Sequence, residues 1–321
     1  MHEFELIKKY FSVLSKENKS SLNLNDDVFF DKSKRLVVSI DTYIEGVHFI
    51  NFKKPNLVIK KILRSSISDL ICKGVKPKFY FISGSGNNKT FSQSNLAKIS
   101  KSLNQEQKKY NILLCGGDTV FSNKLSFTIT SIGFSKKIIF RNNAKLNDDI
   151  YITGNVGDSY TGLRILKNKI NVNKNLKNYF EKSYYQPNLC YDLTNRLLSF
   201  ANTSIDVSDG LITDLEKLIN KQKLSYKLFF KKIPISNNLN KLLNMKKFKK
   251  ISFISKGDDY QILFTANPSK SRIISKISKT LGIKISKIGK ICSASQKSEI
   301  IDQKGKKIDL KNKGFYHNFR S

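Results

Sequence analysis

Cysteine is scarce in this sequence, and its spacing excludes two common uses. The four cysteines are widely separated and form no C-x-x-C pair: Cys72, Cys115, Cys190 and Cys292. A zinc cage needs closely spaced ligands, and a disulfide framework is typical of short secreted domains. We therefore expect reduced thiols, most of them buried.

Long apolar runs are also missing. No stretch approaches the roughly 18 apolar residues that a membrane-spanning helix needs. The first residues, MHEFELIKKYF, contain Glu3 and Glu5 and do not form the apolar centre of a secretory signal. We expect a soluble, cytoplasmic protein with no membrane partner. With 321 residues, of which 39% are hydrophobic, the chain is long enough for two α/β domains with separate cores.

Acidic residues are few, and the formal net charge is +33. Such a charge is typical of nucleic-acid-binding proteins. However, of the 58 basic residues only seven are Arg and 51 are Lys, which is less suited to bidentate contacts with bases or phosphates. The lysines are spread over the whole chain and form no patch interleaved with aromatic residues. A lysine-rich solvated surface explains the charge more simply, and we disfavour a nucleic-acid partner.

Short β-rich runs alternate with amphipathic segments, which predicts an α/β or α+β fold. The expected strands are residues 35–40, 111–115, 125–133, 149–153 and 203–207. The expected helices are residues 56–73, 92–109, 158–168, 188–201 and 209–221. The polar stretch at residues 134–148 separates two such sets, and we place a domain boundary within it, giving domains 1–140 and 141–321.

Aspartates follow several of the expected strands, beside Gly, Ser or Thr. They are Asp26, Asp27, Asp41, Asp69, Asp118, Asp206, Asp209, Asp258 and Asp259. In α/β proteins ligands bind beyond strand ends, where loops converge. Carboxylates gathered there repel one another unless a cation holds them, and oxygen ligands without a His or Cys cluster favour Mg²⁺. Each Asp alone is better explained as a turn former or helix cap, so the prediction depends on the set.

Two glycine-rich segments are ambiguous by themselves. Gly116 and Gly117 before Asp118 allow the backbone to approach a ligand closely, although such a segment is commonly a tight turn. The segment TGNVGDSYTGL is neither a G-x-G-x-x-G motif nor a Walker A motif, which favours close helix–strand packing over phosphate binding. His48, taken alone, is best explained as structural.

Taken in order, nine segments resemble the thiamine-monophosphate kinase family, whose superfamily also contains aminoimidazole ribonucleotide synthetase and selenophosphate synthetase. The combination of GGDT, SDGL and D-T-x-x-E-G-x-H-F in this order is specific. The segments are EFELIKKYF, NDDVFF, LVVSIDTYIEGVHF, SISDLICKGVKPKF, YNILLCGGDTVFSNKLSFTITSIGF, FRNNAKLNDDIYITGNVGDSYTGL, IDVSDGLITDL, KGDDYQILFT and GFYHNF.

The resemblance implies a two-domain, aminoimidazole ribonucleotide synthetase-like fold, with an N-terminal sheet that forms a homodimer interface and a C-terminal α/β domain. It implies ATP as co-substrate, thiamine monophosphate as acceptor and Mg²⁺ as cofactor. The magnesium ligands it implies are Asp27, Ser39, Asp41, Asp69, Asp118, Asp206 and Asp209, of which the catalytic ones are Asp27, Asp41, Asp69, Asp118 and Asp209. The implied ATP contacts are Tyr110, Gly117, Asp118, Arg141 and Ser208, and the implied acceptor contacts are His48, Asp258 and Phe315.

The chain departs from the family pattern at four positions. Asn25 and Asn147 replace glycines, and Asn tolerates positive φ better than other non-glycine residues. Ile40 stands where Thr is usual and removes one hydroxyl. Asp258 stands in KGDD, where the family has a GGED-like segment, and it is one methylene shorter than Glu.

The resemblance also predicts a mechanism without a general base. The phosphate of the acceptor has a second pKa near about 6, so it is already ionised near neutral pH. The enzyme must then position two polyanions in line and neutralise their charge. Two alternatives stay open: another ATP-dependent enzyme of the same superfamily, and a non-enzymatic nucleotide- or nucleic-acid-binding protein.

Overall fold

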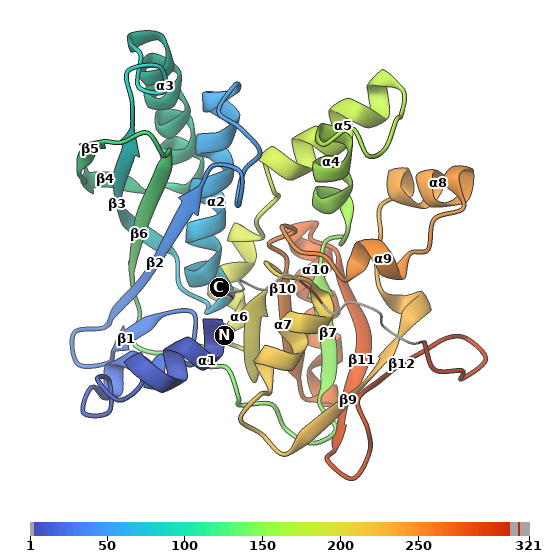
Figure 1. Cartoon of the computed structure of the whole chain (residues 1–321). Helices are drawn as coiled ribbons and strands as arrows, with labels where there is room; N and C mark the ends of the chain where they lie inside the picture. The colour runs from blue at the N-terminus through green and yellow to red at the C-terminus, as the bar shows by residue number, and fades with distance from the viewer. Residues whose placement is uncertain (1–2, 309–313, 315–321) are drawn as a thin grey trace.

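The computed structural model describes residues 3–308 and residue 314, and it contains two mixed β-sheets with helices packed on them (Figure 1). The six-stranded N-terminal sheet has the order β1-β2-β6-β3-β4, with β5 also paired to β3. The six-stranded C-terminal sheet has the order β12-β9-β11-β7-β10-β8. The α/β (α+β) class expected from the sequence is confirmed.

The bounds of the elements follow the chain in two groups. The N-terminal group is α1 (Glu3–Leu6), η1 (Ile7–Phe11), η2 (Lys19–Leu24), β1 (Phe29–Asp31), β2 (Leu36–Ile44), α2 (Pro55–Cys72), β3 (Pro77–Gly86), α3 (Gln93–Tyr110), β4 (Leu113–Gly116), β5 (Thr119–Phe121) and β6 (Ser126–Phe134). The C-terminal group is β7 (Asp149–Thr153), α4 (Asp158–Leu166), α5 (Lys174–Tyr185), η3 (Tyr191–Leu193), α6 (Thr194–Leu197), β8 (Thr203–Asp206), α7 (Leu211–Leu218), β9 (Leu224–Phe229), η4 (Phe230–Lys232), α8 (Asn237–Lys246), α9 (Ile251–Ile254), β10 (Ile262–Ala266), η5 (Pro268–Lys270), α10 (Ser271–Leu281), β11 (Ile285–Ser293) and β12 (Glu299–Ile301).

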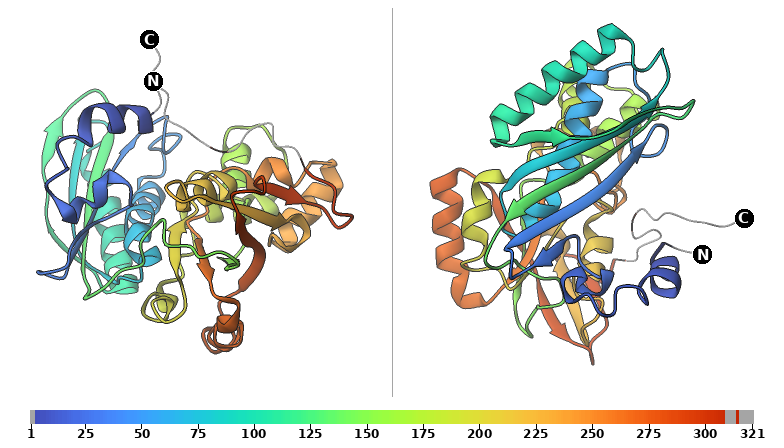
Figure 2. Two further views of the ribbon diagram at one scale, coloured as in Figure 1. Left: turned by 90° about the horizontal axis from the view of Figure 1, so that it is seen from below. Right: turned by 90° about the vertical axis from the view of Figure 1, so that its left-hand side faces the viewer.

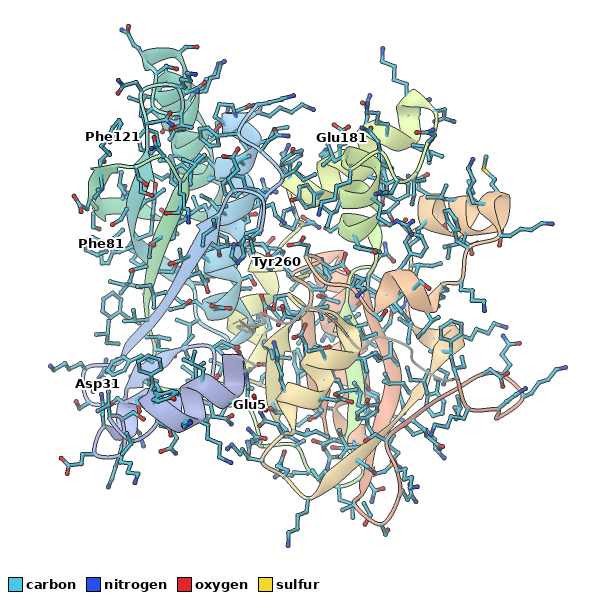
Figure 3. All side chains as sticks on the ribbon, in the orientation of Figure 1. Glu5, Asp31, Phe81, Phe121, Glu181 and Tyr260 are labelled. Atoms are coloured by element: carbon cyan, nitrogen blue, oxygen red, sulfur yellow. The ribbon has the colours of Figure 1, made fainter. Side chains whose placement is uncertain are left out.

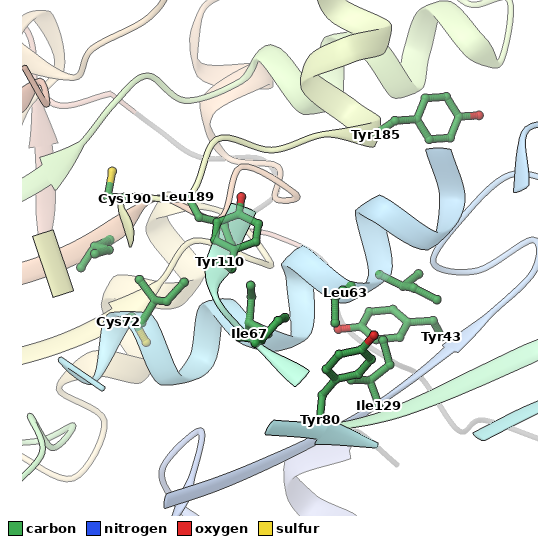
Figure 4. Packing of buried hydrophobic residues seen from close by; sticks show 14 of the residues in the cluster. Tyr43, Leu63, Ile67, Cys72, Tyr80, Tyr110, Ile129, Tyr185, Leu189 and Cys190 are labelled. Carbon is green, nitrogen blue, oxygen red and sulfur yellow. The ribbon is translucent and has the colours of Figure 1, made fainter. Parts of the chain in front are cut away.

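Helix α2 lies between the two sheets and forms a core that both domains share (Figures 1 and 2). It starts with Pro55 in its first turn, where the fixed φ of proline suits a helix and the missing N–H costs nothing. Almost all of its side chains are buried, because it packs on β2 and β6 on one side and contacts β8 on the other. Figure 4 shows Leu63 and Ile67 of this helix among the aromatic rings of the same core.

Strand β2 holds the predicted site residues Ser39 and Asp41 at fixed positions because it pairs along its whole length with β6. The antiparallel register places Ser39 opposite Ser131 and Asp41 opposite Ile129. In the C-terminal sheet, β7 is buried at all five positions, and Tyr151 stacks on Phe264 of β10 at a centroid distance of 5.3 Å. Strand β8 is also fully buried and ends at Asp206, close to α2.

One predicted helix is wrong, and several strands were not predicted. Residues 188–201 form only the short η3 and α6 rather than a continuous helix. Strands β1, β3, β5, β9, β10, β11 and β12 were not among the expected strands. Among the residues that the structure describes, no helix is both long and apolar enough to cross a membrane.

Candidate functional site

A cavity of about 390 Å³ opens between the two domains, where the end of β2, helix α2, the end of β8 and the segment before β10 converge. Among the predicted site residues, those that line it are His48, Asp41, Asp69, Asp206, Ser208, Asp209 and Asp258. These residues come from distant parts of the chain, so the structure brings together half of the residues that the sequence motifs singled out.

Three carboxylates form the acidic side of the cavity: Asp41 on β2, Asp69 on α2 and Asp206 at the end of β8. Burial raises the pKa of Asp41 to about 6. Burial, and then the nearby Asp41 charge, raises the pKa of Asp206 to about 6 as well. The pKa of Asp69 is raised well above its usual range by burial and by the charges of the other two. A bound cation would relieve this mutual repulsion.

Hydroxyl groups hold two of these carboxylates in place. Ser39 Oγ donates to Asp69 Oδ2 at 2.6 Å, across from β2 to α2. Ser68 Oγ, on α2, donates to Asp206 Oδ2 and so links the helix to the C-terminal sheet. Ser39 therefore lies beside the predicted cluster as a hydrogen-bond donor to Asp69.

The donor chemistry of the cluster suits Mg²⁺, since it consists of carboxylates without His or Cys. Within residues 3–308 and 314, however, no group of three or more His, Cys, Asp or Glu side chains is arranged to hold a metal ion by itself. Any magnesium at Asp41, Asp69 and Asp206 therefore needs further oxygen ligands, which phosphate groups can supply.

The loop after β8 is fixed by close backbone packing. A Cβ atom on Gly257 would lie 1.6 Å from the carbonyl oxygen of Ser208, so only glycine fits there. The N–H of Asp258 donates to the same carbonyl at 2.8 Å. Asp209 forms an ion pair with Lys217 of α7, and the buried Asp214 carboxylate accepts the Asp209 N–H at 3.0 Å. This segment thus presents Ser208 and Asp209 to the cavity in a rigid form.

Aromatic side chains also line the cavity, and a buried ammonium lies next to them. Lys61 Nζ lies 2.7 Å from Asp258 Oδ1 and 4.2 Å from the ring centroid of Tyr184. The hydroxyl of Tyr260 donates to Asp258 at 3.1 Å, and Figure 3 shows Tyr260 between the two domains. His48 lines the cavity as well, and its Nδ1 accepts the N–H of Ile44 at 3.0 Å.

Sequence reasoning missed Lys61, Tyr184 and Tyr260. A signal for Lys61 was present, because the polar residues Lys61, Ser65 and Asp69 recur every four residues in this helix. This spacing places them on one helix face. Ser65 and Asp69 line the cavity, and Lys61 contacts the cavity residue Asp258.

Other predicted residues lie away from this cavity. Tyr110 is buried in the core against Tyr191, at a centroid distance of 5.5 Å, and Figure 4 shows it beside Leu189 and Cys190. Gly117 and Asp118 lie in the exposed turn between β4 and β5. Their assignments to ATP and metal stay predictions.

Three further assignments also stay predictions. Asp27 and Arg141 form a bidentate ion pair with each other, in which Arg141 Nε donates to Asp27 Oδ2 at 3.1 Å and Nη2 contacts Oδ1. Phe315 lies outside the described residues.

Comparison with known proteins identifies relatives over the whole chain. A family model described as "AIR synthase related protein, N-terminal domain" matches residues 24–135. The thiamine-monophosphate kinase of Buchnera aphidicola subsp. Acyrthosiphon pisum is 34% identical over 335 residues, covering 98% of each chain. That of Haemophilus influenzae is 30% identical, covering 91% of this chain and 89% of the relative.

The fold is also found in solved structures. The structure of AaThiL complexed with AMPPCP and TMP superposes with a TM-score of 0.84, covering 99% of this chain and 97% of that one, at 24% identity. At this identity the likeness establishes the fold.

Proposed function

The chain belongs to the thiamine-monophosphate kinase family, and on that premise we propose that it transfers the γ-phosphoryl group of ATP to thiamine monophosphate, forming thiamine diphosphate. The observation that carries the proposal is that Asp41, Asp69 and Asp206, from both domains, line a single cavity together with His48 and Asp258. A cavity lined by clustered carboxylates and by aromatic groups suits a phosphorylated cation that binds with magnesium.

Magnesium would be held by Asp41, Asp69 and Asp206, with Asp209 close by. When bound, it would supply positive charge against the phosphate oxygens of donor and acceptor. The chain itself positions the ligands of the metal and the nucleotide. Ser39 and Ser68 hold the carboxylates of Asp69 and Asp206, and the rigid 207–209 loop presents Ser208 to the nucleotide. The acceptor phosphate is ionised near neutral pH, so transfer proceeds in line without a general base.

The acceptor end is proposed to bind the thiamine moiety. Asp258 offers a negative charge to the thiazolium cation, and the rings of Tyr184 and Tyr260 offer faces for stacking or cation–π contact. Lys61 compensates the Asp258 charge from behind, which keeps Asp258 at the cavity edge. Two direct contacts, from Lys61 and Tyr260, hold the Asp258 side chain. This side chain is shorter than the Glu of the family pattern.

We also propose that the chain is divided into two domains at about residue 140. We further propose a homodimer formed through the N-terminal sheet. The side chains of β4 and β5 are exposed, including Leu113, Val120 and Phe121, which is 71% exposed. Figure 3 shows Phe81 and Phe121 on the side of this sheet that faces away from the C-terminal domain. Such an apolar surface is typical of subunit interfaces. We place the enzyme in the cytoplasm, where ATP is available.

The experiment that tests the proposed activity is a chromatographic assay for thiamine diphosphate, with purified protein, ATP, Mg²⁺ and thiamine monophosphate. Product should form with time and in proportion to protein, and an excess of EDTA should abolish its formation. No product above a protein-free control would refute the proposal.

A further inference from the structure

A buried lysine lies directly behind the predicted magnesium ligand Asp27. Lys73 follows the last residue of α2, and its side chain is completely buried. Its ammonium nitrogen lies 2.7 Å from Asp26 Oδ1, 2.8 Å from Asp27 Oδ2 and 2.8 Å from the carbonyl oxygen of Ser204. Three acceptors thus match the three N–H donors of the ammonium group.

The ammonium group keeps its charge in this position. Two carboxylate oxygens and one carbonyl oxygen surround its nitrogen, and each can accept one of its three hydrogens. Lys73 is therefore a fixed internal cation between the N-terminal loop and β8 of the C-terminal sheet.

Arg141 completes a closed set of charges. Its backbone N–H donates to Asp26 Oδ2 at 2.9 Å, and its guanidinium contacts both oxygens of Asp27 through Nε and Nη2. Two carboxylates, Asp26 and Asp27, thus face two cations, Lys73 and Arg141. The charges balance without any metal ion.

The contacts leave Asp27 poorly suited to hold magnesium. Each of its oxygens already contacts a cationic group, and both Asp27 and Arg141 have side chains only 10% exposed. A metal at Asp27 would have to displace Arg141 or take a carboxylate from Lys73. Removing a partner from a buried charge is strongly destabilising, because the remaining charge is left unpaired away from water. Asp41, Asp69 and Asp206 are different, because their charges repel one another and they line the cavity.

We propose that the Lys73 ammonium takes the place of a metal ion at Asp26 and Asp27, and that Asp27 is a positioning residue for Arg141 instead of a magnesium ligand. The Asp27 carboxylate accepts hydrogen bonds from Nε and Nη2 of Arg141 and so fixes the guanidinium group. This leaves Nη1 to donate to a phosphate oxygen. This inference rests on the proposed function only where it assigns Arg141 to ATP. The metal assignment stands on the geometry alone.

The first test counts metal ions instead of measuring turnover. Mn²⁺ binding is titrated by electron paramagnetic resonance at AMPPCP concentrations that saturate each protein, for wild type, Asp27→Asn and Asp69→Asn, with Asp31→Asn at the end of β1 as the matched control. Asp27→Asn should bind as many Mn²⁺ ions as wild type, with affinities within about twofold, whereas Asp69→Asn should lose roughly 10- to 100-fold in affinity. Loss of one Mn²⁺ ion in Asp27→Asn would overturn the proposal.

The second test separates positioning from general damage. Asp27→Asn should weaken AMPPCP binding by about tenfold, while Asp31→Asn leaves it unchanged and the melting temperature of Asp27→Asn stays high enough for a folded protein at the assay temperature. Unchanged AMPPCP affinity in a folded Asp27→Asn protein would contradict the positioning role.

A third test uses the unaltered chain, so it holds even if the variants do not fold. Hydrogen exchange measured by mass spectrometry should show the peptide covering residues 22–31 equally protected in EDTA and in Mg²⁺ alone. The peptides that contain Asp69 and Asp206 should gain protection in Mg²⁺ plus AMPPCP. Protection of residues 22–31 that appears only with Mg²⁺ would overturn the proposal. Failure of the kinase assay with these results intact would affect the proposed function and leave the metal assignment standing.

Discussion

The ammonium nitrogen of Lys61 lies 2.7 Å from Asp258 Oδ1, which ties the central helix α2 to the proposed acceptor end of the cavity. Removing the ammonium by Lys61→Met would leave the Asp258 charge without its main partner and free to shift. The KM for thiamine monophosphate should rise by about tenfold, with a smaller change in the KM for ATP. Steady-state kinetics with each substrate varied in turn checks this.

The neighbouring Lys60→Met is the matched control, since it lies on the same helix. If Lys61→Met and Lys60→Met have the same KM for thiamine monophosphate, Lys61 does not position Asp258 for the acceptor.

Asp206 joins the proposed metal cluster at the end of β8. Asp206→Asn keeps the size of the side chain and the possibility of a hydrogen bond to Ser68 but removes the negative charge. Turnover should fall roughly 100-fold, since a lost charged ligand weakens metal placement. The melting temperature should stay equal to or above that of wild type, because a buried repulsive charge is removed. Turnover within a few-fold of wild type would remove Asp206 from the cluster.

Arg141 is held by Asp27, and Lys in its place cannot reproduce the bidentate contact. Arg141→Lys should raise the KM for ATP by about tenfold or lower kcat to a similar extent, with little effect on the KM for thiamine monophosphate. The control is Arg272→Lys in α10, where the side chain is exposed. ATP kinetics that are alike in the two variants would mean that Arg141 serves only to join the domains.

Lys250 gives a prediction on stability. Burial, and then the nearby Lys284 charge, lowers the pKa of Lys250 from 10.5 to about 8. Between pH 8 and 10.5 the unfolded chain therefore binds more protons at this residue than the folded chain, so its contribution to stability becomes more favourable as pH rises. The free energy of unfolding, measured with urea, should increase from pH 7 to pH 10 more for wild type than for Lys250→Met. A difference between the two that does not change with pH would show that Lys250 titrates normally.

Local pattern was enough to predict the central elements. The run DIYIT predicted strand β7 at its observed bounds, and the helix predicted at 56–73 corresponds to α2 at Pro55–Cys72. Strand β3 was missed because its sequence, PKFYFISGSG, begins with proline and ends in Ser and Gly, which favour turns. It forms because β6 and β4 pair with it on either side. Pairing of this kind is set by the tertiary fold.

In the candidate site, too, some residues could be predicted from local sequence and others depend on the tertiary fold. The motifs predicted Asp41, Asp69 and Asp206, because each lies at or near the end of an element or on a helix face that meets the cavity. They could not predict that Asp27 would be matched by Lys73, since 46 residues of sequence and a whole helix separate the two. A lysine in a lysine-rich chain carries no signal of burial. The contact is visible only when the fold places the end of α2 behind the Asp26–Asp27 loop.

The central claim, transfer from ATP to a phosphorylated acceptor, is tested most directly by following the label from [γ-³²P]ATP. The protein is incubated with Mg²⁺ and either thiamine monophosphate or unphosphorylated thiamine, and the products are separated by chromatography. Label should appear in thiamine diphosphate with the first acceptor, and the rate with thiamine should be lower by at least ~100-fold, because a neutral hydroxyl is a much weaker nucleophile than an ionised phosphate. Equal labelling of both acceptors, or label released only as inorganic phosphate, would contradict the account.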